Sequence, residues 1–197
     1  MFFLAWTIIV LLALFEIFML FSLVEHVYSL RIRHQYPQVS CRVAHGRAIV
    51  DDIIKHYPNA RSAVDIGAGY GRLARAMARI DGLDIIAIEN MRFSIVVMRI
   101  LNYLFGARRI HVVFADAFEY IRCSNTKFDI GVAYLGPGMN GRLRELSNKF
   151  NVIITLDVEI PGIKATRIID VPGGRCTHYS DIGNFPNRLF VYEFSKI

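Results

Sequence analysis

The first segment of the chain is apolar almost without interruption. Residues Met1 to Val24 contain a single ionisable side chain, Glu16. A helix needs about 20 apolar residues to cross the hydrocarbon core of a membrane, and this run is long enough. It has neither the basic start nor the small-residue cleavage site of a secretory signal peptide. We therefore expect a transmembrane helix over residues 1–27, followed by a polar stalk over residues 28–38.

The charges that flank this segment indicate its orientation. No Lys or Arg precedes it, whereas Arg31, Arg33, Arg42 and Arg47 follow it. Positively charged flanks stay on the cytoplasmic side of a membrane. We therefore expect a single-pass membrane protein whose globular part lies in the cytoplasm. Glu16 would either contact another helix or be tolerated as a neutral acid, and we favour the second interpretation.

From residue 39 onward, short apolar runs alternate with segments that have apolar residues at helical spacing. The runs at 63–66, 84–88, 111–114, 128–133 and 152–156 are typical of strands buried on both faces. Helices are expected over 72–80, 93–105, 117–121 and 141–150, and over a segment that Ser40 caps and Tyr57 ends. Strands that alternate with helices predict a parallel sheet covered on both faces.

The end of the chain departs from this alternation. Residues 166–171 and 188–194 resemble strands, and the stretch between them is rich in Gly and Pro and has no helical pattern. We expect the two strands to complete the sheet as an antiparallel pair. The predicted fold class is therefore α/β: a doubly wound, Rossmann-like sheet of seven strands in one domain over residues 39–197, preceded by the transmembrane helix.

Composition adds few constraints. The chain has 197 residues, enough for one domain with a short appendage, and its net charge of +6 suits an anionic lipid surface, an acidic partner or nucleic acid. Cys41, Cys123 and Cys176 lie far apart and form no C-x-x-C pair, and the histidines are equally scattered. We therefore expect reduced thiols and no metal site.

The most informative motif follows the first buried strand. Its sequence is Asp65-Ile66-Gly67-Ala68-Gly69-Tyr70-Gly71. Glycines allow positive φ and a close approach of the backbone to a ligand, and the helix that follows presents unpaired N–H groups. Ligands of doubly wound sheets bind at these carboxyl ends of strands. The spacing G-x-G-x-G differs from the G-x-G-x-x-G of dinucleotide sites.

Acidic residues follow the next two strands. Glu89 ends the second strand, where a carboxylate can accept hydrogen bonds from both hydroxyls of a ribose. Asp116 follows the third strand and either accepts a hydrogen bond from an adenine amino group or caps the next helix. The sequence leaves both roles of Asp116 open.

This order of glycines and acids resembles the class I S-adenosylmethionine-dependent methyltransferases. The resemblance implies S-adenosyl-L-methionine as the cofactor. The binding residues that it implies are Gly67, Gly69 and Gly71 at the methionine part, Asp65 near its amino group, Glu89 on the ribose and Asp116 at the adenine.

A narrower resemblance involves Gly69-x-Gly71-Arg72 and the Tyr-Leu-Gly-Pro-Gly-Met stretch over residues 134–139. With the apolar first segment, these motifs are similar to a group of membrane-anchored protein-lysine methyltransferases. The group includes the enzyme that acts on the ATP synthase c subunit and its archaeal and bacterial relatives. Its members usually have Asp where Tyr70 stands here.

The same group usually has a Pro-Thr-Pro stretch before the first helix of the domain, and residues 39–41 are Val-Ser-Cys instead. A lysine substrate must lose a proton before it accepts a methyl group, and an aromatic-lined channel would lower its pKa by desolvation. Tyr134 is the candidate catalytic residue, as a wall of that channel. Its alternative role is that of an ordinary core tyrosine.

These features predict an S-adenosylmethionine-dependent methyltransferase, and more specifically a protein-lysine N-methyltransferase that acts on a membrane-associated protein. The alternatives are a small-molecule or lipid methyltransferase and a non-catalytic scaffold. Asp65, the three glycines and Glu89 argue against a scaffold. A nucleic-acid partner is not expected, because Arg72, Arg75 and Arg79 need be no more than a basic helix face.

Overall fold

The structure of the chain is a computed structural model that describes residues 2–32, 41–172 and 187–195. The chain divides into two compact units, residues 1–38 and 39–197. Ser40, which was predicted to cap the first helix of the domain, lies outside the described residues, as does Cys176.

The first unit contains one long helix, α1 (Phe2–Ile32). Nearly all of its described side chains are apolar, and large ones such as Trp6 (66% exposed) and Leu20 (63% exposed) have no cover within the unit. The helix includes residues 28–32, which were expected in the polar stalk. An apolar helix surface of this kind requires a partner that is itself apolar.

The transmembrane span predicted over residues 1–27 is not supported. Within the described ranges, no helix combines the length and the apolar character that crossing a membrane demands. Glu16 interrupts the apolar stretch near its centre, and a carboxylate inside a hydrocarbon core is costly.

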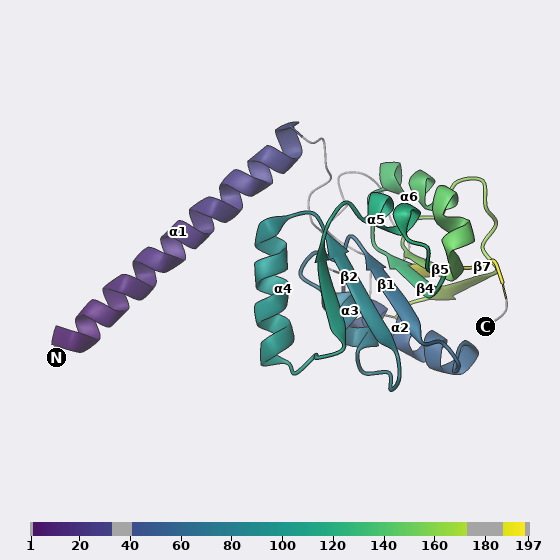
Figure 1. Cartoon of the computed structure of the whole chain (residues 1–197), viewed down its shortest axis with the longest axis horizontal. Coiled ribbons are helices and arrows are strands. Elements are labelled where there is room, and N and C mark those ends of the chain that lie inside the picture. The colour runs from purple at the N-terminus through teal and green to yellow at the C-terminus, as the bar shows by residue number, and fades with distance from the viewer. Residues whose placement is uncertain (1, 33–40, 173–186, 196–197) are drawn as a thin grey trace. The chain divides into compact units, whose positions relative to one another are not determined.

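The second unit is built on a seven-stranded sheet whose strand order is β3-β2-β1-β4-β5-β7-β6 (Figure 1). The strands are β1 (Ser62–Ile66), β2 (Asp84–Glu89), β3 (Ile110–Phe114), β4 (Phe128–Ala133), β5 (Phe150–Leu156), β6 (Arg167–Asp170) and β7 (Arg188–Glu193). Neighbours from β3 to β5 are parallel, and β7 is antiparallel to both β5 and β6. The predicted doubly wound sheet with an antiparallel pair at its end is confirmed.

Helices cover both faces of this sheet (Figure 1). They are α2 (Val43–His56), α3 (Arg72–Met77), α4 (Arg92–Leu104), α5 (Ala117–Cys123), α6 (Pro137–Leu143) and the 3-10 helix η1 (Arg144–Lys149). The first three bury their apolar sides in one core and the last three in the other. Every residue of both cores lies between Cys41 and Phe194, so the unit has its own hydrophobic interior.

The helix predicted over residues 141–150 differs from the structure. The segment begins earlier, at Pro137 in the first turn of α6, and narrows to the 3-10 helix η1 before β5 starts at Phe150. Proline is well suited to the first turn, because the N–H group that it lacks would have no helical partner there.

The strand order reverses between β1 and β4. From β1 the chain builds outward to β2 and β3, then returns to place β4 on the other side of β1. The carboxyl ends of β1 and β4 therefore form the switch point at which doubly wound sheets bind their ligands. All of the site residues predicted from the sequence lie at or just beyond the carboxyl ends of these parallel strands.

Candidate active site

The glycine loop between β1 and α3 has the backbone conformation that its sequence predicts. Gly67, Gly69 and Gly71 all adopt positive φ, at 72°, 54° and 72°. A Cβ atom on Gly67 would lie 2.9 Å from Leu135 Cδ2, and one on Gly71 would lie 2.6 Å from Met98 Cγ. The loop therefore depends on glycine both for its conformation and for space.

Asp65 is buried beneath this loop, with 1% of its surface exposed. Its Oδ2 accepts a hydrogen bond of 2.9 Å from the N–H of Ala74 in α3. Burial raises the pKa of Asp65 to about 7, because it outweighs the hydrogen bond from Ala74, which lowers this pKa; the nearby charge of Glu89 raises it further and that of Arg75 lowers it. A carboxyl group that titrates near neutrality responds strongly to a cation, and the amino group of a bound amino acid is such a cation.

Glu89 links three parts of the site through its carboxylate. Oε2 accepts from the N–H of Gly69 at 2.8 Å, and Oε1 accepts from the N–H groups of Asn90 and Met91 at 2.8 and 2.9 Å. These bonds take about three of the four acceptor positions of a carboxylate. They hold the Glu89 side chain between the glycine loop and the end of β2.

Asp116 caps α5. Its Oδ1 accepts from the N–H groups of Phe118 and Glu119, at 2.9 and 3.0 Å, and lies 3.9 Å from Arg142. Of the two roles left open by the sequence, the structure therefore shows the helix cap. Nearly half of the Asp116 side chain is exposed at the carboxyl end of β3.

The two tyrosines singled out from the sequence lie in aromatic surroundings. Tyr70 of the glycine loop packs edge-on against Phe93 with ring centroids 6.3 Å apart. Tyr134 follows β4, is partly buried, and has its ring 6.1 Å from that of His45. The structure thus places Tyr134 beside a histidine of α2 that the sequence analysis did not select.

A buried polar cluster was missed from the sequence. His45 of α2 and Asp157, directly after β5, have side chains that are each 1% exposed, and His45 Nε2 lies 3.7 Å from Asp157 Oδ1. Asn140 of α6 is fully buried beside them and donates to the carbonyl of Val158 at 2.7 Å. The signal that could have revealed Asp157 is the one that revealed Asp65 and Glu89, a carboxylate at the end of a buried strand.

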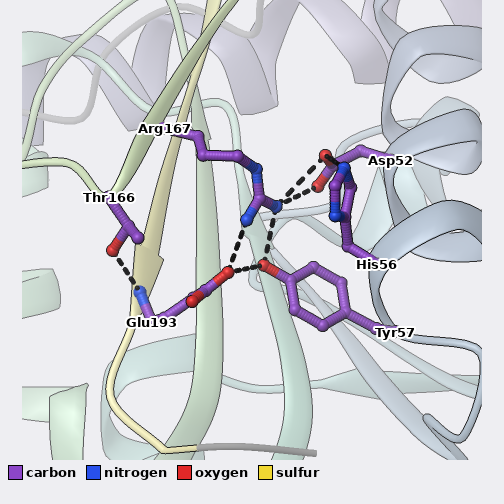
Figure 2. A network of polar contacts seen from close by, with 6 residues as sticks. All are labelled: Asp52, His56, Tyr57, Thr166, Arg167 and Glu193. Carbon is purple, nitrogen blue, oxygen red and sulfur yellow. Dashed lines mark hydrogen bonds and ion pairs between the residues drawn. The ribbon is translucent and has the colours of Figure 1, made fainter.

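A second polar cluster joins the other end of α2 to the last two strands (Figure 2). Arg167 of β6 binds both carboxylate oxygens of Asp52 at 3.1 Å, Glu193 of β7 at 2.5 Å and the hydroxyl of Tyr57 at 2.8 Å. Tyr57 in turn donates to Glu193 at 2.6 Å. We call these four residues the Arg167 cluster.

The charges of the Arg167 cluster support one another. Burial would lower the pKa of Arg167, but the hydrogen bonds with Tyr57 and Glu193 outweigh it and raise that pKa. The hydrogen bond from Tyr57 lowers the pKa of Glu193, and burial raises the pKa of Tyr57. Arg167, Tyr57 and Glu193 therefore hold the protonation states that their contacts need at neutral pH, which indicates a structural cluster.

The remaining candidate ligands are dispersed. Cys41 is buried and Cys123 is exposed, both as free thiols, and burial raises the pKa of Cys41 to about 12. Within the described residues, no three His, Cys, Asp or Glu side chains gather as a metal site.

Solved structures with a similar backbone include several methyltransferases. An RNA methyltransferase from Salinibacter ruber in complex with S-adenosyl-L-homocysteine superposes with a TM-score of 0.64 at 17% identity, over 81% of this chain and 95% of that one. A methyltransferase from Geobacter sulfurreducens gives 0.57 at 16% identity over 88% of each chain. The precorrin-6y C5,15-methyltransferase from Geobacter metallireducens gives 0.52 at 17% identity, over 61% of this chain and 66% of that one.

No protein-family model and no curated protein sequence matches the chain. The structural similarity is nevertheless broad, because it extends over most of this chain and most of the first two neighbours. At identities below 20% it concerns the course of the backbone and leaves substrates open. The chain has the Rossmann-like fold of the S-adenosylmethionine-dependent methyltransferases.

Proposed function

We propose that the protein is an S-adenosylmethionine-dependent methyltransferase. The observation that carries this proposal is the loop of three left-handed glycines, which the carboxylate of Glu89 ties to the end of β2 through Gly69. The loop lies at the switch point of a fold whose solved examples include one with S-adenosyl-L-homocysteine bound. Other side chains pack closely against this loop, so that there is no room for a Cβ atom at Gly67 or Gly71. Glycine, which has no side chain, also lets a ligand approach the backbone closely.

The described residues fit this cofactor. Gly67, Gly69 and Gly71 would hold its methionine part, and the buried carboxyl group of Asp65 would attract its amino group. Glu89, whose carboxylate the backbone bonds hold at the end of β2, would contact the ribose. When bound, the cofactor supplies a methyl group that its sulfonium already activates, so the protein has to align the acceptor and exclude water.

Calorimetry on the full chain in detergent tests this proposal. S-adenosyl-L-homocysteine should bind with a Kd in the micromolar range, about −8 kcal/mol. Gly67→Ala should weaken binding at least tenfold, because the new Cβ meets Leu135 beside the loop. The matched control is Gly106→Ala, which has the same backbone requirement (φ 64°) and nothing within 4 Å of the new Cβ. If NAD bound and S-adenosyl-L-homocysteine did not, the proposal would be wrong.

Our more specific proposal is that the substrate is a lysine of a membrane-associated protein. Its support is the Gly69-x-Gly71-Arg72 and Gly136-Pro137 likeness to protein-lysine methyltransferases, together with the exposed apolar surface of α1. Confining enzyme and substrate to one surface raises their effective concentration without any new contact at the active site. The helix would then bring the domain to its substrate.

The carboxyl end of α4 offers independent support for the proposal that the domain contacts a membrane surface. Tyr103, Leu104 and Phe105 are 87%, 68% and 71% exposed, and the exposed Arg108 and Arg109 follow them. Aromatic and apolar side chains next to arginines suit the boundary between anionic headgroups and lipid chains. We propose that the domain lies on the cytoplasmic face of a membrane with this end of α4 against the headgroups.

Labelling experiments separate the possible substrates. The full chain is incubated with native membranes and the cofactor carrying a labelled methyl group. We expect label in protease-sensitive material, mapped by mass spectrometry to lysine side chains. Label that extracts into organic solvent would instead favour the small-molecule or lipid alternative, and nuclease-sensitive label would favour RNA. Tyr134→Phe should lower the rate of labelling without changing cofactor affinity. Tyr134 follows β4, and β1 lies between β4 and β2, the strand that ends at Glu89.

A further inference from the structure

The cluster of His45, Asn140 and Asp157 contains buried polar atoms that lack partners. His45 Nε2, Asn140 Oδ1 and Asp157 Oδ2 have no hydrogen-bond partner in the described part of the chain. All three side chains are at least nine-tenths buried. An unsatisfied buried polar atom destabilises the folded chain, and three of them on neighbouring side chains indicate a bound ligand.

The hydrogen bonds that these side chains do form show whether each unpartnered atom is a donor or an acceptor. His45 Nδ1 accepts from the N–H of Arg42 at 3.4 Å, which assigns the imidazole proton to Nε2, facing Asp157. Asn140 Nδ2 donates to the carbonyl of Val158 at 2.7 Å, so Oδ1 is the free end of that amide. Two oxygens, Asn140 Oδ1 and Asp157 Oδ2, therefore lack hydrogen-bond donors, whereas the donor of His45 faces the other carboxylate oxygen, Asp157 Oδ1.

The backbone at Asp157 also has an unusual conformation. Asp157 has a φ of 61°, and in the described residues it is the only residue other than glycine with positive φ. The N–H of Val158 donates to the carbonyl of Leu156 at 2.7 Å, which closes a three-residue γ-turn around Asp157. This turn, together with the 3.1 Å bond from Arg188 N–H to Oδ1, fixes the carboxylate at the end of β5.

We propose that His45, Asn140 and Asp157 form a site that binds the amino group of the methyl acceptor. The inference rests on the proposed methyltransferase function and adds the chemical class of its substrate. A primary ammonium group brings three donors and a positive charge, which matches two unpartnered oxygens of which one belongs to a buried carboxylate. A hydroxyl group brings one donor and no charge, and therefore fits less well.

Tyr134 is the partly exposed neighbour of this site, with its ring 6.1 Å from that of His45. An amino group at the end of a thin, unbranched apolar chain would contact the tyrosine ring through its stem when it binds to the cluster.

Binding of a simple amine tests the inference apart from cofactor binding. The full chain, with 15N-labelled histidine, is titrated in detergent with n-butylammonium, and the imidazole signals of His45 are followed by NMR. We expect a saturable shift that n-butanol does not produce. Asp157→Gly and Asp157→Asn should each weaken butylammonium binding at least tenfold, whereas Asp81→Asn, at a fully exposed carboxylate, should not change it.

Both substitutions at Asp157 should fold, because glycine and asparagine tolerate positive φ best. The Tm of Asp157→Gly should equal that of the parent protein or exceed it by up to about 3 °C. A shift of equal size with butanol, no saturable shift, or unchanged binding in the Asp157 variants would overturn the inference, and the cluster would then hold an internal water only. Affinity for S-adenosyl-L-homocysteine is measured on the same variants and should not change, which keeps this result separate from the test of the proposed function.

Discussion

Helix α2 carries a polar cluster at each end, and the two clusters are built in different ways. At the carboxyl end, Asp52 and Tyr57 belong to the Arg167 cluster, in which opposite charges meet at hydrogen-bond distance. At the amino end, His45 and Asp157 approach to 3.7 Å without a hydrogen bond. Only the Nε of Arg167 lacks a partner in the first cluster, as far as the described residues show, whereas each member of the second has an unpartnered atom.

This difference indicates that the carboxyl end of α2 supports the fold and that its amino end is available to a ligand. Buried charges in a structural role are paired, because an unpaired one destabilises the native state. A cluster that stays incomplete in the folded chain keeps its hydrogen-bonding capacity for another molecule. We therefore assign a structural role to the Arg167 cluster and a binding role to the amino end of the same helix.

Removing the central cation should have the largest effect. Arg167→Ala leaves Asp52, whose side chain is 4% exposed, without its counter-charge and should lower the free energy of unfolding by about 3–5 kcal/mol. Chemical denaturation measures this loss. The control is Arg188→Ala, which breaks an exposed ion pair with Asp170 and should cost less than about 1 kcal/mol. Equal losses in the two variants would show that the Arg167 cluster is not structural.

Asp65 extends the comparison to a buried carboxyl group without a close counter-charge. Its pKa of about 7 in the folded chain lies above the ordinary value of 3.8, so burial of the ionised form destabilises the fold above pH 7. That penalty disappears as the pH falls from about 7 to 4, because the folded chain then binds the proton more tightly than the unfolded chain. Asp65→Asn should therefore raise the free energy of unfolding by about 2–4 kcal/mol at pH 8 and by little at pH 4.

Denaturation of Asp65→Asn across this pH range gives the measurement, with the exposed Asp81→Asn as the control. A gain in stability that did not vary with pH would contradict the raised pKa. A bound cation beside Asp65 would favour its ionised form, so the affinity for S-adenosyl-L-homocysteine should rise with pH up to about 7 in the parent protein. The variant should show no such rise.

The sequence predicted the sheet well because its central strands, such as β1, β4 and β5, are buried on both faces. The limits of β4 (Phe128–Ala133) agree with the prediction, and those of the other strands differ by only a few residues. Apolar runs of this kind hold information that is local in the chain. The start of α6, the helix after β4, was harder to predict, because whether Pro137 begins a helix depends on the packing of the residues after it.

The site was predicted only in the part that one local motif specifies. The glycines, Asp65 and Glu89 follow from strand ends and spacing, and the structure places them together. His45 and Asp157 could not be paired in this way, because they come from opposite ends of the domain sequence and meet only after the sheet forms. Arg167 and Asp52 were missed for the same reason, being 115 residues apart.

A conservative change within the Arg167 cluster should have an intermediate effect. Tyr57→Phe removes the hydroxyl that bridges Arg167 and Glu193 but leaves their direct contact in place. We expect a loss of about 1–2 kcal/mol in the free energy of unfolding, the ordinary range for a hydrogen bond to a charged group. In the double variant with Arg167→Ala the two losses should not add, since both residues act in one network. Simple additivity would show that Tyr57 contributes independently.

The smallest effect on stability should come from the other end of α2. His45→Leu removes an unpartnered Nε2 and keeps a side chain of similar size, so the free energy of unfolding should change by less than about 1 kcal/mol. Thermal denaturation at neutral pH is sufficient to measure it. A loss above 3 kcal/mol would mean that His45 and Asp157 form a stabilising ion pair, and the contrast between the two ends of α2 would be lost.

The Arg167 cluster also constrains when the domain can finish folding during synthesis. Asp52 in α2 and Tyr57 directly after it are synthesised early, whereas Glu193 is synthesised much later. Strand β7, which brings Glu193, is inserted between β5 and β6. Chains are made at about 5–20 residues per second, so α2 waits several seconds for its contacts with Arg167 and Glu193. A ribosome that stalls before residue 193 therefore holds a domain in which the Arg167 cluster is incomplete.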